Sequence, residues 1–84
     1  MMQGLYSIFD RKAVSYGAPM FFANDEIAKR SCADTMRAGG DFAYVYYPDD
    51  FDVYRVGSFD TNEGVIVPQV PAVLVCRFAD FVRS

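Results

Sequence analysis

The segment from residue 24 to residue 38 carries the clearest helix signal in this chain. Asn24 is a good N-cap, and Asp25 and Glu26 place negative charge at the positive end of the helix dipole. Gly39-Gly40 then supplies residues that can adopt the left-handed conformation that ends a helix. An apolar stripe recurs at every fourth position within the segment, at Ala28, Cys32 and Met36. The sequence therefore predicts a helix over residues 24–38 with one face on a core.

Before this helix, the chain predicts one strand and one loop. Residues 3–14 begin with a strand pattern in which bulky side chains occupy both alternating sets, so we expect a central strand covered on both faces. Arg11-Lys12 marks the point where this strand leaves the sheet. Gly17 and Pro19 make residues 15–23 a loop, and the aromatic side chains of that loop indicate that it packs against the domain.

The stretch that follows the helix is aromatic. Residues 41–47 contain Phe42 and three tyrosines and predict a short strand or an extended segment. Pro48-Asp49-Asp50 has the composition of a turn and separates this stretch from the next strand.

Two further strands are predicted on either side of a hairpin turn. Residues 51–60 predict a strand, and Asp60–Gly64 contains the Asp, Asn and Gly residues that favour a β-hairpin turn. Val65–Val67 returns as the next strand. Pro68 and Pro71 lack the backbone N–H that a ladder needs, so we expect them to end its pairing.

The C-terminal segment 71–84 is ambiguous. Val73–Cys76 is typical of a strand, whereas Phe78, Phe81 and Val82 follow at the spacing of a helical turn, so we expect a strand and then a short helix. The predicted element order is β-α-β-β-β-α. The fold class is α+β, a single domain over residues 1–84 with one main helix packed on a three- to four-stranded, mainly antiparallel sheet.

Composition excludes several classes of function. The chain has no histidine, so imidazole acid–base chemistry and histidine-containing metal sites are absent. Cys32 and Cys76 do not form a Cys-x-x-Cys motif, and we interpret them as reduced, buried thiols. The net charge of −3 argues against a polybasic polyanion binder. No apolar run reaches the ~18–20 residues of a membrane span. We therefore expect no cofactor, no metal, no membrane segment and no enzymatic activity.

Three segments resemble one viral family. Residues 5–13 read Leu-Tyr-Ser-Ile-Phe-Asp-Arg-Lys-Ala, and residues 24–30 read Asn-Asp-Glu-Ile-Ala-Lys-Arg. Residues 47–64 contain a Tyr-Pro-x-Asp-Phe strand followed by a Gly-x-Phe-Asp hairpin, and this segment is the most specific of the three. With these segments in this order, the chain resembles the small nonstructural protein of gokushoviruses, the Microviridae phages with single-stranded DNA genomes.

The resemblance implies a non-capsid phage protein of the host bacterial cytoplasm. Such a protein would act when the replicating genome switches to single-stranded DNA synthesis and packaging. The resemblance implies a binding role toward DNA or toward viral replication or capsid proteins, and no catalytic residues. The alternative is a homodimeric protein–protein interaction module without direct DNA contact.

Single-stranded DNA binders combine a basic groove with exposed aromatic rings, because every base offers a face for stacking. The basic candidates are Arg11, Lys12, Lys29, Arg30, Arg37 and Arg55. The aromatic candidates are Tyr44, Tyr46, Tyr47 and Tyr54. Each set of candidates also has a purely structural interpretation. Lys29 and Arg30 each follow an acidic residue by four positions, which favours ion pairs on a solvated helix face. Tyrosines are commonly half-buried in sheets.

A domain this small with 52% hydrophobic residues has more apolar surface than it can bury. Surplus apolar surface usually marks an interface, and an exposed sheet edge can also add a strand from a partner. The candidate interface residues are Phe21, Phe22, Phe78 and Phe81. We therefore expect a homo-oligomer.

Overall fold

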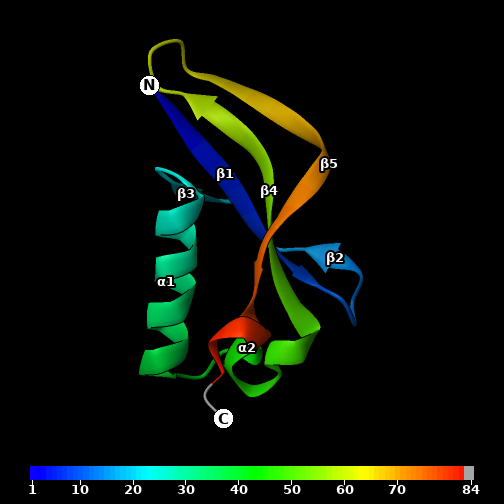
Figure 1. Ribbon diagram of the computed structural model, residues 1–84. Helices are drawn as coiled ribbons and strands as arrows, with labels where there is room; N and C mark the ends of the chain where they lie inside the picture. The colour runs from blue at the N-terminus through cyan, green and yellow to red at the C-terminus, as the bar shows by residue number, and fades with distance from the viewer. Residues whose placement is uncertain (83–84) are drawn as a thin grey trace.

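The computed structural model describes residues 1–82, and it consists of one antiparallel sheet with a single long helix against one face (Figure 1). The strand order is β2-β1-β4-β5, with β3 also paired to β1. The strands are β1 (Met2–Asp10), β2 (Ser15–Tyr16), β3 (Met20–Phe22), β4 (Phe51–Asp60) and β5 (Val65–Arg77). The helical elements are α1 (Asp25–Ala38), α2 (Ala43–Tyr46) and two 3-10 turns, η1 (Pro48–Asp50) and η2 (Phe78–Phe81). The predicted α+β class, with one main helix on an antiparallel sheet, is confirmed.

The core lies between α1 and the sheet. Its buried members are Tyr6, Ala28, Cys32, Val53, Cys76 and Phe78. Ala28 and Cys32 belong to the predicted apolar stripe, and Met36 packs against the same core. Asn24 caps the helix as expected, because its side-chain oxygen accepts a hydrogen bond from the backbone N–H of Ile27. At the other end, Gly39 has a positive φ of 76° and ends the helix.

β1 is the central strand, as its two bulky faces predicted. Tyr6 packs on the core, and Ile8 lies on the same face, toward α1. Leu5, Ser7 and Phe9 alternate with them and point to the opposite side of the sheet. We call this second side, which is turned away from α1, the outer face.

The expectation that residues 15–23 form a loop is wrong in part. Two short strands, β2 and β3, return along β1, and Phe9 pairs with Tyr16 while Leu5 pairs with Phe21. Gly17 and Pro19 lie in the connection between them. Residues of this segment pair with β1 along the edge opposite β4. The glycine and proline in the segment favoured a loop and gave no sign of this pairing.

The expectation of an extended segment over residues 41–47 is also wrong. Residues 43–46 form the short helix α2. Packing explains the difference: the ring of Tyr44 stacks on Phe42 and on Phe78, with centroid distances of 5.2 Å and 4.5 Å. Tertiary contacts therefore override the strand preference of the aromatic residues.

Pro68 and Pro71 do not end the strand that contains them. β5 continues to Arg77, but its register against β4 jumps from Gly57–Pro68 to Arg55–Val73. The residues between these pairs, 69–72, bulge out of the ladder, so the prolines interrupt pairing locally and the strand then resumes. The turn at Asp60–Gly64 closes the hairpin as predicted, and the chain ends in the expected strand followed by a helical turn, η2. Residues 83–84, the end of the predicted C-terminal segment, lie outside the described part of the chain.

No helix in residues 1–82 has the length and apolar character to cross a membrane.

Candidate nucleic-acid interface

The outer face of the sheet gathers aromatic side chains from four strands. Strand alternation sends Tyr54 to the side opposite Val53, which is in the core. Residues that pair across an antiparallel ladder point to the same side, and Phe9 pairs with both Tyr16 and Asp52. Phe9, Tyr16 and Tyr54 therefore share the outer face.

These three rings form one cluster, which we call the outer aromatic triad. The centroid of Phe9 lies 4.8 Å from that of Tyr16 and 5.9 Å from that of Tyr54. Tyr16 and Tyr54 are 5.8 Å apart and meet edge to face. Tyr16 is 50% exposed, whereas the side chains of Phe9 and Tyr54 are less exposed than that of Tyr16. Solvent thus reaches part of a preassembled aromatic surface.

A second aromatic pair extends this surface along the sheet. Phe21 of β3 and Phe59 of β4 lie 5.6 Å apart in an edge-to-face arrangement. Phe21 pairs with Leu5, which places it on the outer face, and it is 48% exposed. Five aromatic rings therefore line the side of the sheet that α1 leaves uncovered.

Basic residues border one end of the triad. Arg11 directly follows β1, and its Nε lies 3.2 Å from Oδ2 of Asp52, the residue that pairs with Phe9. Arg11 also donates a hydrogen bond to the backbone carbonyl of Asp49. Arg77 of β5 pairs with Asp52 from the other side and is exposed. The charge at this border is therefore mixed, because Asp52 lies between two arginines.

Asp52 itself is 3% exposed, and its Oδ1 has no hydrogen-bond partner among the described residues. Arg11 therefore provides the main charge compensation for a buried carboxylate. The main role of Arg11 is therefore structural. Only those N–H groups of its guanidinium that do not bind Asp52 or Asp49 are available for a phosphate.

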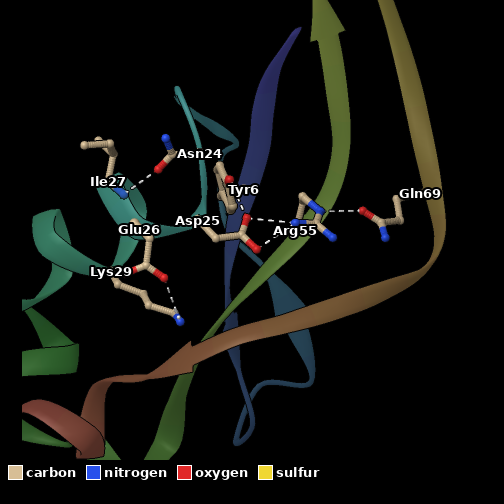
Figure 2. A network of polar contacts seen from close by, with 8 residues as sticks. All are labelled: Tyr6, Asn24, Asp25, Glu26, Ile27, Lys29, Arg55 and Gln69. Carbon is tan, nitrogen blue, oxygen red and sulfur yellow. Dashed lines mark hydrogen bonds and ion pairs between the residues drawn. The ribbon is translucent and has the colours of Figure 1, made fainter.

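Arg55, the basic candidate in the middle of β4, is also committed to structural contacts (Figure 2). Its Nη1 lies 2.7 Å from Oδ2 of Asp25 at the start of α1, and its Nε donates to Oε1 of Gln69 at 2.7 Å. The hydroxyl of Tyr6 donates to Oδ1 of the same Asp25, also at 2.7 Å. Four side chains from three strands (β1, β4 and β5) and from α1 thus form one network on the α1 side.

This network shifts the pKa values of two of its members. Burial raises the pKa of Tyr6 to about 12, and the hydrogen bond to Asp25 acts in the same direction. For Asp25, burial raises the pKa, but the hydrogen bonds from Tyr6 and Arg55 and the charge of Arg55 outweigh it, so the pKa is lowered overall. The network therefore holds a neutral phenol beside an ionised carboxylate near neutral pH.

The basic candidates on α1 differ in whether they form an ion pair. Lys29 pairs with Glu26 at 3.5 Å and Arg37 with Asp34 at 3.0 Å, each over three residues. The predicted pairing of Asp25 with Lys29 is wrong, because Asp25 is taken by Arg55. Lys12 and Arg30 are exposed, and neither has an ion-pair partner within residues 1–82. The six basic candidates do not converge on one face.

The tyrosine candidates also separate by environment. Tyr44 is half-buried and stacks on Phe78, so it is not a free stacking surface. Tyr46 and Tyr47 are largely exposed beside α2, with ring centroids 6.5 Å apart. Of the tyrosines proposed from the sequence, only Tyr54 belongs to the outer aromatic triad.

Three of the four proposed interface phenylalanines are not suited to that role. Phe78 is 1% exposed and belongs to the core, which contradicts its assignment to an interface. Phe22 and Phe81 are half-buried against the same core. Phe21 alone is substantially exposed, on the outer face.

Sequence reasoning missed Phe9, Tyr16 and Arg77 as candidate binding residues. The alternation of residues 5–10 already placed Phe9 opposite Tyr6 and Ile8. The presence of Tyr16 on the same face depended on β2 returning along β1, which the Gly/Pro pattern of residues 15–23 did not reveal.

A family profile and a related protein both connect this chain to the ORF5 proteins of phages. Residues 3–81 match the profile of the Phage ORF5 protein family. The chain is 38% identical over 66 residues to Protein ORF5 of Chlamydia phage 1, a match that covers 75% of this chain and 69% of that protein. No solved structure matches the chain. The resemblance to the gokushovirus nonstructural protein is thereby confirmed, and the chain belongs to the Phage ORF5 protein family.

Proposed function

We propose that this protein is a nonstructural phage protein that binds single-stranded DNA on the outer face of its sheet. In this proposal it acts without catalysis in the host cytoplasm, during synthesis or packaging of the single-stranded genome. The membership in the Phage ORF5 protein family supports the viral setting.

One observation carries the proposal: Tyr16 is 50% exposed and contacts Phe9 and Tyr54 on a sheet face that no helix of residues 1–82 covers. Unpaired bases offer flat π-faces, and stacking on an aromatic side chain contributes about 1–3 kcal/mol per base. Because Phe21 and Phe59 continue the surface, the face has room for more than one base. Double-stranded DNA hides its base faces, so this surface favours the single-stranded form.

Charge is a secondary contribution. Arg11 and Arg55 are held by aspartates, which leaves Lys12 and Arg77 as the basic residues near this face with the fewest competing contacts. Few phosphate contacts release few counterions, so we expect a shallow dependence of affinity on salt. The net charge of −3 fits a binder that relies on stacking more than on electrostatics.

Titration of a fluorescently labelled oligo(dT) at two salt concentrations tests the proposal, with anisotropy as the readout. We expect the wild-type protein to bind, and Tyr16→Leu to bind about 5- to 150-fold more weakly, because it loses a stacking ring worth about 1–3 kcal/mol. The matched control is Tyr46→Leu, which removes an exposed tyrosine from α2 and should leave affinity unchanged. Absence of binding at low salt, or equal losses in both variants, would refute the proposal.

A further inference from the structure

Two hairpin turns of this fold follow the same pattern. Residues 11–14 join β1 to β2, and residues 61–64 join β4 to β5, so each turn has four residues. The aspartate that ends the first strand, Asp10 or Asp60, accepts hydrogen bonds through Oδ1 from the backbone N–H groups two and three positions later. The two turns can therefore be compared position by position.

The last position of each turn has a positive φ. Gly64 occupies it in the second turn with a φ of 68°, whereas Val14 occupies it in the first turn with a φ of 54°. Val14 is the only non-glycine residue with a positive φ within residues 1–82. The left-handed conformation brings the Cβ of an L residue close to its carbonyl oxygen, and a β-branched side chain makes this worse. The first turn therefore carries strain that glycine avoids in the second.

The fold makes little use of the Val14 side chain. Val14 is 74% exposed, and within residues 1–82 it is not one of the apolar residues that pack on the core. Its isopropyl group therefore buries little apolar surface that could offset the strain. Strained residues are concentrated at functional sites. A valine at this position thus points to a contact outside the folded chain.

The strained turn lies next to the outer aromatic triad. Val14 immediately precedes β2, whose Tyr16 belongs to the triad. Lys12 of the same turn is exposed and has no ion-pair partner within residues 1–82. In Figure 1 the β1–β2 hairpin lies on the side of the sheet away from α1. An aliphatic group between an aromatic surface and a cation suits a nucleotide, because its base has apolar faces and its phosphate is anionic.

We propose that Val14 contacts the single-stranded DNA, which continues from the outer aromatic triad along the β1–β2 hairpin. Val14 packs against the base that follows those stacked on the triad, and Lys12 binds a neighbouring phosphate. Apolar side chains packed between bases are a recurrent feature of protein–DNA complexes. This inference rests on the proposed function and extends its site from the sheet to the hairpin turn. Glycine at this position would relieve the strain but lose the contact.

The variant Val14→Asn tests the contact, because asparagine tolerates the left-handed conformation and lacks the aliphatic group. We expect its melting temperature to rise by about 4–8 °C, since the strain is relieved. We expect its affinity for oligo(dT) to fall about 3- to 15-fold, as for loss of a partly buried valine side chain. Stability and affinity then change in opposite directions, which a purely structural residue would not show.

Two matched variants serve as controls. Gly64→Val places the same strain in the second turn, where an added Cβ meets no atom of residues 1–82 within 4 Å. It should lower the melting temperature and leave the affinity for oligo(dT) unchanged. Val14→Ile keeps an aliphatic side chain and should bind oligo(dT) as the wild type does.

The outcomes separate this inference from the proposed function. Binding that Tyr16→Leu weakens and Val14→Asn does not would overturn the Val14 contact alone, and would favour a protein partner at the turn. Equal losses of affinity in Val14→Asn and Gly64→Val would also overturn it. A melting temperature of Val14→Asn that does not rise would show that Val14 carries no strain, and would likewise overturn the contact. Absence of binding by the wild type would refute the proposed function as well.

Discussion

Arg55 of β4 and Asp25 of α1 form an ion pair between residues 30 positions apart, with Nη1 2.7 Å from Oδ2. The pair joins the middle of the sheet to the first turn of the helix, and Tyr6 and Gln69 complete its hydrogen bonds (Figure 2). Arg55, which the sequence suggested as a DNA contact, therefore links the sheet to the helix.

Replacing Arg55 with methionine should lower the free energy of unfolding by about 1–2 kcal/mol, because a half-buried carboxylate loses its charged partner. The matched control is Lys29→Met, which breaks the exposed pair with Glu26 and should cost less than about 0.5 kcal/mol. Urea unfolding measures both. Equal effects of the two substitutions would show that the Arg55–Asp25 pair contributes no more than a surface pair.

Tyr6 should make stability fall at alkaline pH. Its pKa is raised from 10.0 to about 12 in the folded protein. Between these values the unfolded chain releases the phenolic proton while the folded chain retains it, so the contribution is complete below pH 10 and is lost as pH rises toward 12. The stability of the wild type relative to Tyr6→Phe should therefore drop by roughly 1 kcal/mol from about pH 9 to about pH 11. A difference between the two proteins that does not change with pH would contradict the raised pKa.

The buried carboxylate of Asp52 depends on Arg11. Arg11→Met should destabilise the protein by about 2–3 kcal/mol, because it leaves a charge uncompensated at a position that is 3% exposed. Adding Asp52→Asn to this variant removes the charge and should recover a large part of the loss. Thermal or urea unfolding of the two variants provides the measurement, and a double variant that is less stable than Arg11→Met alone would contradict the account.

The two cysteines should react slowly in the folded protein. Cys32 and Cys76 are both buried and unbridged, as the sequence suggested. A hydrogen bond between the two thiols lowers the pKa of Cys32 and raises that of Cys76. A thiol reagent such as DTNB should find both thiols in urea, and react about a hundredfold or more slowly in buffer, since access requires local opening. Rapid labelling of the folded protein would show that the α1–sheet core is open.

The elements that rest on local signals were predictable from the sequence. The helix with its cap and apolar stripe, the central first strand and the hairpin turn all depend on residues within a few positions of one another. The short strand β2 and the helix α2 were not predicted, because each is stabilised by distant partners. Tyr16 pairs with Phe9 on β1, and Tyr44 stacks on Phe78 near the C-terminus.

The candidate site was harder to predict for the same reason. Residue type identified arginines and tyrosines but could not show which were already engaged. Arg55 is paired with Asp25 and Tyr44 is packed on the core, whereas Tyr16 is exposed on the outer face. The outer aromatic triad exists only because three strands bring Phe9, Tyr16 and Tyr54 to one side of the sheet.

Photochemical crosslinking shows whether single-stranded DNA lies on the outer face. An oligonucleotide carrying 5-iododeoxyuridine crosslinks to aromatic side chains on which its bases stack, and mass spectrometry of the digested complex identifies the attached residue. We expect crosslinks at Tyr16, Tyr54 or Phe9 that a competing unlabelled oligo(dT) suppresses. Specific crosslinks confined to Tyr46 and Tyr47 beside α2, or none at all, would contradict this placement of the DNA.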